Sequence, residues 1–151
     1  MARLFLTYSN KLNPGGTQPY TLCQFEAPDN QRVVISAIEI HPFGSSGATP
    51  AIEFDLVTQT SEGVGGNSGS FVINSPGADE TPQTTVLYGP FTTEPTGPVT
   101  QYPIAMHQQS PNIWRPINAF REAIMIKNAR WGLRVLTACS FDIGFCVQLE
   151  E

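Results

Sequence analysis

A serine set among glycines is the feature of this sequence that most suggests chemistry. The run Gly65-Gly66-Asn67-Ser68-Gly69-Ser70 is similar to the turn that presents the nucleophile in chymotrypsin-like proteases. Such a nucleophile needs a general base and an orienting acid, roles that would fall to His41 and Asp55. These two residues are too close in sequence for two barrels to be built around them. Because short motif matches carry a high false-positive risk, we expect residues 65–70 to form a glycine- and serine-rich loop.

Two histidines and one pair of carboxylates are the remaining candidates for a catalytic or metal site. His41 and His107 each follow an apolar run, so we expect both at strand ends on the surface. Glu53 and Asp55 alternate along a predicted strand and share one face, where they could serve glycoside hydrolysis or bind calcium. Such a pair is more often a solvated strand face. We therefore predict no catalytic residue, no metal ligand and no cofactor, and a small hydrolase using Glu53 and Asp55 is the enzymatic alternative.

The three cysteines, Cys23, Cys139 and Cys146, lack the number and spacing of a disulfide framework or a zinc site. We predict three reduced thiols, with Cys23 and Cys139 packed as small apolar groups. A disulfide between Cys139 and Cys146 across a final hairpin is the alternative.

The composition predicts one β-rich domain spanning residues 1–151. Only 14% of the residues are charged, against about 25% in an average domain, and glycine and proline number 13 each. Many turn-forming residues and few charges favour strands joined by turns. The formal net charge of −5 argues against a nucleic-acid partner, which needs a basic surface. No apolar run is long enough to span a bilayer, so we expect no membrane partner.

The stretch from Trp131 to Leu149 has the clearest strand pattern. Successive side chains of a strand point to opposite faces, and here every second residue is apolar. The alternating apolar residues are Trp131, Leu133 and Val135, then Phe141, Ile143, Phe145, Val147 and Leu149. The short segment 137–140 between the two runs predicts a hairpin.

Further short strands are predicted along the rest of the chain. Residues 32–43 form a long β-branched run. In its first half, apolar side chains occupy both odd and even positions, which predicts burial on both faces of the strand there. Residues 61–82 read as a long loop interrupted by a short edge strand, and residues 108–116 as an irregular corner. The other predicted strands cover residues 3–8, 20–25, 51–60, 84–88 and 99–107, with residues 71–73 as a candidate edge strand. Residues 120–126 could form a strand or one helical turn, and Ile124-Met125-Ile126 favours the strand. Eight or nine short strands with long connections favour an all-β, antiparallel, jelly-roll-like β-sandwich.

Apolar and aromatic residues near the turns are candidates for contact with a partner. Trp114 and Arg115 are of the types favoured as interface anchors, although Trp114 could instead plug one end of the sandwich. Residues 4–6 are either core or a strand offered to a neighbouring chain. The full candidate interface is Leu4, Phe5, Leu6, Phe91, Tyr102, Trp114 and Arg115.

Several ordered motifs are shared with a known family. Ala27-Pro28-Asp29-Asn30-Gln31-Arg32-Val33 opens a β-branched strand, Glu94-Pro95-Thr96 follows, and Arg130-Trp131-Gly132-Leu133-Arg134-Val135 precedes the final strand and Glu150-Glu151. This layout resembles the jelly-roll head-decoration (cement) proteins of tailed bacteriophages.

The resemblance implies a structural protein without enzymatic activity. It implies a homotrimer, made in the bacterial host cytoplasm and seated on the capsid exterior. There it would bind the major capsid protein and tie neighbouring coat subunits together. Residues 89–97 and 108–116, with the N-terminal strand, are the expected contacts. The alternative is a tail or fibre-tip jelly roll that binds host-surface glycans through exposed aromatic residues such as Tyr102 and Trp114.

Overall fold

The structure is a computed structural model of the chain, and it describes residues 4–9, 11–14, 19–43, 51–73, 81–107, 112–116, 123–138 and 141–151. Cys139 and the predicted strand residues 3 and 120–122 lie outside the described residues.

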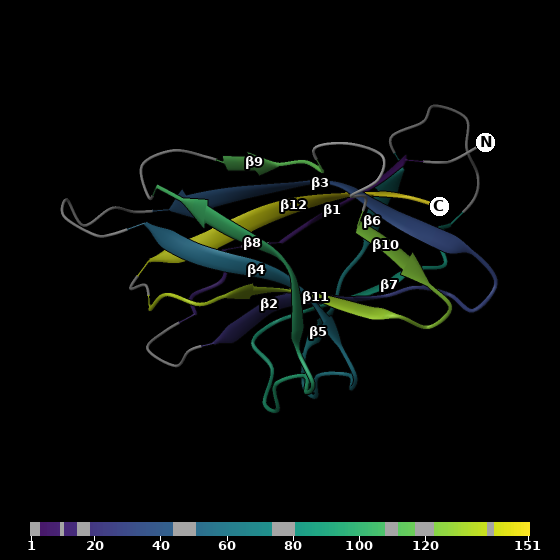
Figure 1. Cartoon of the computed structure of the whole chain (residues 1–151), viewed down its shortest axis with the longest axis horizontal. Coiled ribbons are helices and arrows are strands. Elements are labelled where there is room, and N and C mark those ends of the chain that lie inside the picture. The colour runs from purple at the N-terminus through teal and green to yellow at the C-terminus, as the bar shows by residue number, and fades with distance from the viewer. Residues whose placement is uncertain are drawn as a thin grey trace.

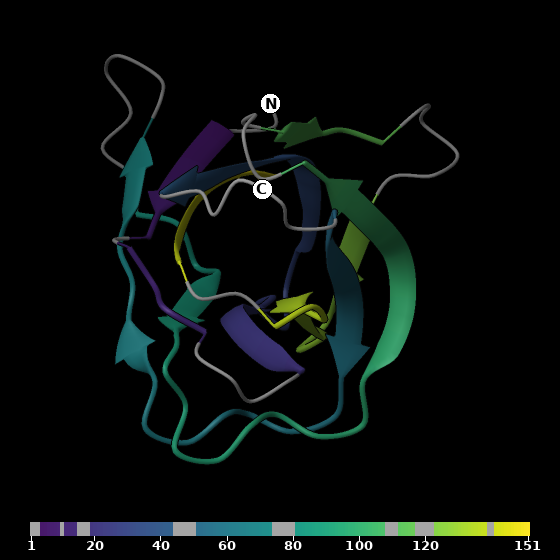
Figure 2. The same cartoon turned by 90° about the vertical axis from the view of Figure 1, so that its left-hand side faces the viewer.

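The fold is an all-β sandwich of two antiparallel sheets (Figure 1). Sheet A contains β1 (Leu4–Tyr8), β3 (Arg32–Phe43), β6 (Phe71–Ile73), β9 (Asn112–Trp114), β10 (Ala123–Ile126) and β12 (Asp142–Glu150). Sheet B contains β2 (Tyr20–Glu26), β4 (Ile52–Gln59), β5 (Asn67–Ser68), β7 (Thr85–Tyr88), β8 (Val99–Met106) and β11 (Arg130–Val135). Turned by 90°, the two layers curve toward each other around the core (Figure 2).

The strand order is that of a jelly roll with an insertion. Sheet A runs β10-β3-β12-β1-β6, with β9 also paired to β3, and sheet B runs β5-β7-β2-β11-β4-β8. If the inserted strands β5, β6 and β7 are set aside, each sheet has four strand positions, because β9 and β10 share the position beside β3. Most connections between consecutive strands then cross from one sheet to the other. Two interlocked Greek keys produce this alternation. The insertion adds one strand to sheet A and two to sheet B, at the same side of the sandwich.

The predicted alternation in the last two strands is confirmed. The apolar residues at alternate positions of β11 and β12 face the core, where they are at most 6% exposed. They meet apolar residues from the inner faces of the other long strands, chiefly Leu22, Phe25, Ile35, Ile38, Ile40, Ile52, Phe54, Leu56, Ile104 and Met125. Burial of this apolar surface holds the two sheets together, at about 25 cal/mol per Å² removed from water.

The predicted hairpin between the last two strands is wrong. β11 pairs with β2 and β4 in sheet B, whereas β12 pairs with β1 and β3 in sheet A. The segment between them therefore crosses from one layer to the other. β11 and β12 each have neighbours on both sides, and the jelly-roll order supplies these from distant parts of the sequence.

Two short strands were not predicted. β5 lies in the stretch expected to be loop, and β9 lies in the expected irregular corner. The described residues contain twelve strands, more than the eight or nine expected. Both strands pair along one side only, β5 with β7 and β9 with β3. Two or three residues carry too little alternation to signal a strand, and their extended form depends on the neighbour to which they bond.

β3 contains a bulge, so the core-facing residues have odd numbers before it and even numbers after it. Leu149 pairs with Ile35 and Gln148 with Ala37, so Ser36 is an extra residue on β3. The phase shift brings Ile35 before it and Ile38 after it to the core. The prediction of burial on both faces is therefore wrong for this segment.

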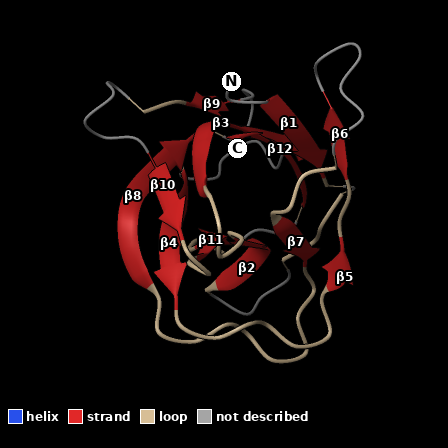
Figure 3. Cartoon of the chain, turned by 90° about the vertical axis from the view of Figure 1, so that its right-hand side faces the viewer, coloured by secondary structure: helices blue, strands red, loops and turns tan. Residues whose placement is uncertain are grey.

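The insertion forces two connections to cross the outer face of sheet B. β4 and β5 lie on opposite sides of β11, β2 and β7, while β7 and β8 lie on opposite sides of β2, β11 and β4. Residues 60–66 and 89–98 make these crossings side by side, and we call them the loop cover. Figure 3 shows both as loops running together beneath β2 and β11. Among the described strands of sheet A, only β9 and β10 are consecutive in sequence, and both lie beside β3. Their connection therefore does not have to cross the outer face of sheet A.

Side chains close the two sides of the sandwich. On the side of the insertion, the Thr7 hydroxyl of sheet A contacts the Tyr88 hydroxyl of sheet B and donates to the Ser70 carbonyl at 2.9 Å. On the other side Tyr102 of β8 lies with its ring centroid 5.1 Å from that of Trp114 and 6.3 Å from that of Trp131. Aromatic pairs at such distances add to the stabilisation from buried area.

Candidate binding surface

The residues of the protease-like pattern are not brought together. Ser68 is exposed on β5 at the edge of sheet B, whereas His41 lies on the outer face of sheet A. Asp55 belongs to β4 and is committed to an ion pair with Arg134. The expectation of a loop is correct for most of residues 65–70, with Asn67 and Ser68 forming the short strand β5.

Asp55 forms a buried ion pair rather than a solvated surface group, so that prediction is wrong. The Nε of Arg134 donates to Oδ1 at 3.0 Å and its Nη2 to Oδ2 at 2.6 Å, and the Thr100 hydroxyl donates to Oδ2 at 2.9 Å. The carboxylate is 1% exposed and the Arg134 side chain 12%. Glu53 shares the outward face of β4 but is exposed. Charge-assisted contacts at both oxygens give Asp55 a structural function.

The other predicted chemical groups are also dispersed. His41 lies with its Nε2 3.3 Å from Oε1 of Glu39, and His107 is exposed beyond β8. Within the described ranges, no group of three or more His, Cys, Asp or Glu residues could hold a metal ion. Cys23 and Cys146 are free thiols. Cys23 packs in the core as predicted, and burial raises the pKa of its thiol; burial and then the charge of Glu39 raise the pKa of Cys146.

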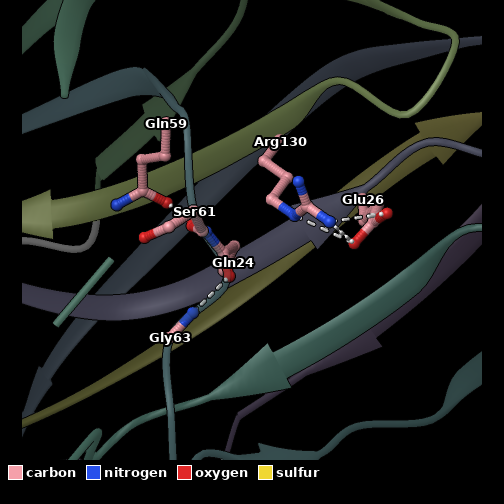
Figure 4. A network of polar contacts seen from close by, with 6 residues as sticks. All are labelled: Gln24, Glu26, Gln59, Ser61, Gly63 and Arg130. Atoms are coloured by element: carbon pink, nitrogen blue, oxygen red, sulfur yellow. Dashed lines mark hydrogen bonds and ion pairs between the residues drawn. The ribbon is translucent and has the colours of Figure 1, made fainter. Parts of the chain in front are cut away.

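Two glutamines attach the loop cover to sheet B (Figure 4). The Nε2 of Gln24 donates to Oε1 of Gln59 and to the carbonyl of Ser61, both at 2.8 Å, while its Oε1 accepts from the Gly63 amide at 3.0 Å. Gln24 is 3% and Gln59 is 6% exposed, although both point outward from the sheet. The cover therefore buries polar groups that a bare sheet would leave in water, and hydrogen bonds offset the cost for Gln24, whereas Nε2 of Gln59 has no partner among the described residues.

Phe91 holds the two crossings of the cover together. Its ring lies so close to Gly63 and Gly66 that an added Cβ would come within 2.4 Å and 2.5 Å of ring atoms, so glycine is needed at both positions. Backbone bonds join the two crossings, with the Val64 amide donating to the Thr93 carbonyl at 3.0 Å. Phe91, a predicted interface residue, therefore has a packing role in this structure.

Compared with the outer face of sheet B, which the loop cover crosses, the outer face of sheet A carries more exposed apolar side chains. Its strands present apolar side chains that are 44–62% exposed, namely Tyr8, Phe43, Val72, Ile113 and Ile126. The pairing places Val72 beside Leu6, and Tyr8, Cys146, Glu39 and Ile113 in one row across β1, β12, β3 and β9. Of the eight large hydrophobic residues that are exposed in the described chain, five lie on this face. Because five exposed apolar side chains lie on it, this sheet face is a candidate contact surface.

The predicted interface residues fall into different environments. Phe5 is core at 2% exposure, while Leu4 and Leu6 lie half-buried on the outer face of sheet A. β1 pairs with β12 on one side and with β6 on the other, so it is not a free strand offered to a neighbour. Tyr102 and Trp114 pack against each other between the sheets, and Arg115 is exposed beside them.

A groove of about 560 Å³ opens beside β5 and β7. Hydroxyl groups and apolar side chains line it together, among them Ser68, Ser70, Phe71, Thr85 and Leu87, with the carboxylate of Glu62. Thr84 also lines the groove, is 3% exposed, and its hydroxyl has no hydrogen-bond partner in the structure.

Comparison with known protein families, with curated proteins and with solved structures finds no match for this chain. Among the described residues there is also no helix of the length and hydrophobicity needed to cross a membrane.

Sequence reasoning did not single out the exposed residues of sheet A. Tyr8, Val72 and Ile113 are apolar residues of strands, and the same residue types fill the core. The available signal was their position between buried neighbours in an alternating strand. Phe5 and Thr7 face inward, so Leu6 and Tyr8 must face outward. What parity could not reveal is that the other sheet would be covered and this one exposed.

We expect Asp55→Ala to be strongly destabilising, because it leaves the Arg134 guanidinium buried without a partner. The free energy of unfolding should fall by about 3–5 kcal/mol, measured by urea denaturation. Replacing Asp55 and Arg134 together by leucine and methionine should cost less than the single change. Equal losses in the two variants would contradict a structural ion pair.

We expect Phe91→Ala to loosen the loop cover while leaving the sandwich folded. The loss of its packing should lower the free energy of unfolding by about 1–2 kcal/mol. Hydrogen exchange should quicken at the Thr60 and Val64 amides, which bond across the cover. Phe43→Ala, at an exposed phenylalanine of sheet A, is the matched control and should leave those amides protected. Unchanged exchange in Phe91→Ala would exclude this packing role.

Proposed function

We propose that this protein is a decoration (cement) protein of a tailed-bacteriophage head, a virion structural protein that binds the capsid exterior and ties coat subunits together. The observation that carries the proposal is the contrast between the two outer faces. The chain's own loops cross the outer face of sheet B, whereas sheet A presents five exposed apolar side chains on its outer face. The sequence motifs that resemble the cement family supply the biological context.

A mechanical tie requires a body that does not deform under load. Side-chain contacts between the layers close both sides of this sandwich, through Thr7 with Tyr88 and Tyr102 with Trp114. The cover braces sheet B from outside, and its polar contacts fix the crossings to β2. Such a body transmits force between contacts rather than absorbing it.

The proposed partner is the major capsid protein, and the proposed assembly is a homotrimer. Three modest contact surfaces on one trimer give high avidity without any new chemistry. The protein is made in the bacterial host cytoplasm and acts on the outside of the head. With a formal net charge of −5, a protein surface is a better partner for it than nucleic acid.

The contact surface proposed from the structure differs from the one expected from sequence. Residues 89–97 belong to the loop cover, and the N-terminal strand is enclosed between β12 and β6. Deleting that strand would damage sheet A itself, so point substitutions on its outer face are the better probe.

The direct test is to add the purified protein to assembled heads that lack it. We expect saturable binding to the heads, visible by electron microscopy as added density on the exterior. The decorated heads should release their DNA at a higher temperature than bare heads, because subunits that are tied together separate less readily. Sedimentation of the free protein checks the trimer. Heads that bind no protein, or that gain no heat resistance, would contradict the proposal.

The alternative is a tail or fibre-tip module that binds host glycans. The groove beside β5 and β7 favours it, because hydroxyl groups, Phe71 and the unpartnered Thr84 hydroxyl meet there. A glycan array with the purified protein, followed by Phe71→Ala, tests this reading. Binding to a defined glycan that is lost in the variant would support the alternative over the capsid proposal.

A further inference from the structure

The side chain of Glu151 joins three segments that are far apart in the sequence. Glu151 directly follows β12, a central strand of sheet A. Its Oε1 accepts from the Thr84 amide at 2.7 Å, and its Oε2 accepts from the Gln83 amide at 3.1 Å and from Nε2 of Gln31 at 2.9 Å. One carboxylate therefore connects the end of β12 to the turn between β2 and β3 and to the residues that lead into β7 of sheet B.

Residues 81–84, which we call the strap, form part of the wall of the groove beside β5 and β7. Thr81, Pro82 and Thr84 line the groove. β7 begins at Thr85, and its ladders with β2 and β5 do not include the strap. The strap must therefore be held in place by contacts other than strand pairing.

The contact with Glu151 is suited to hold the strap. Hydrogen bonds to an ionised carboxylate are roughly twice as strong as those between neutral groups. The Thr84 hydroxyl is buried and has no hydrogen-bond partner in the structure, so the polar contact of this residue with Glu151 is made by its amide. An amide that loses its acceptor in a part-buried position pays a desolvation cost that an amide in water does not.

The strap buries little of its own surface. Thr84 is 3% exposed, whereas Thr81 and Gln83 are exposed and Pro82 is half-buried. One side of the strap faces the groove, which is open space of about 560 Å³. Segments with few buried contacts and no strand ladder open at a lower free energy than the whole fold.

We propose that Glu151 is a latch that holds the strap against the sandwich, so that breaking its contacts opens one wall of the groove while both sheets stay folded. Gln31 acts as a positioning residue, because its amide holds the carboxylate on the side away from Thr84. This inference goes beyond the proposed function, and it depends on neither the capsid proposal nor the glycan alternative.

The test is amide hydrogen exchange of the purified full-length protein, with substitutions at two adjacent glutamates. Glu151→Ala removes the latch, and Glu151→Gln keeps one acceptor oxygen without the charge. Glu150→Ala is the matched control, because Glu150 carries the same charge and follows the buried Leu149, so it faces outward from sheet A. Thermal unfolding of each variant confirms that the fold is retained.

The parent protein itself shows whether the strap opens locally. We expect the Thr84 amide to exchange at a rate that low concentrations of urea leave unchanged, because opening the strap exposes little surface. The Leu133 amide of the buried strand β11 should exchange faster as urea is added. Exchange at Thr84 that rises with urea in parallel with Leu133 would overturn the inference, because the strap would then open only when the whole fold does.

The variants show whether Glu151 is the latch. We expect the Thr84 amide to exchange at least about tenfold faster in Glu151→Ala than in the parent, and by a smaller factor in Glu151→Gln. Glu150→Ala should exchange as the parent does. A parent-like rate at Thr84 in Glu151→Ala would overturn the inference. An equal acceleration in Glu150→Ala would also overturn it, because the effect would then follow from the net charge rather than from the contact.

Discussion

The structure depends on one constraint: strands that are consecutive in sequence mostly lie in opposite sheets. β1 to β4 alternate between sheet A and sheet B, and β11 and β12 do so again at the end of the chain. Neither sheet can therefore be completed without the other, and the apolar inner faces are buried only when both are present. Each pairing closes a long loop, which costs chain entropy before burial compensates for it. The fold is cooperative for this reason.

The same constraint makes the two outer faces unequal. Inserting three strands after β4 places β5 and β8 at the far edges of sheet B, so two connections must cross its outer face. Polar residues of sheet B that lose contact with water, such as Gln24 under those crossings and Asp55 on β4, are retained because they find hydrogen-bond partners. Sheet A needs no such crossing in the described chain. Its outward apolar residues therefore remain accessible, and a partner outside the chain can bury them.

The proposed binding role rests on this asymmetry between the two outer faces. The side chains that could have formed an active site are separated by the fold: Ser68 on β5, His41 on the outer face of sheet A, and Asp55 in a buried ion pair with Arg134. The exposed apolar side chains on the outer face of sheet A can instead provide area for a protein contact. The proposal of capsid decoration rests on that face.

The sequence by itself determined the all-β class, most strand positions and the inward face of each long strand, because alternation depends only on residue order. It correctly placed Phe145 and Cys23 in the core. Tertiary structure decided which strands are neighbours, that Asp55 is buried, and that Phe91 packs inside a cover rather than facing a partner. These outcomes depend on contacts between residues far apart in sequence. Local patterns show which way a side chain points, but only the path of the chain decides what lies over it.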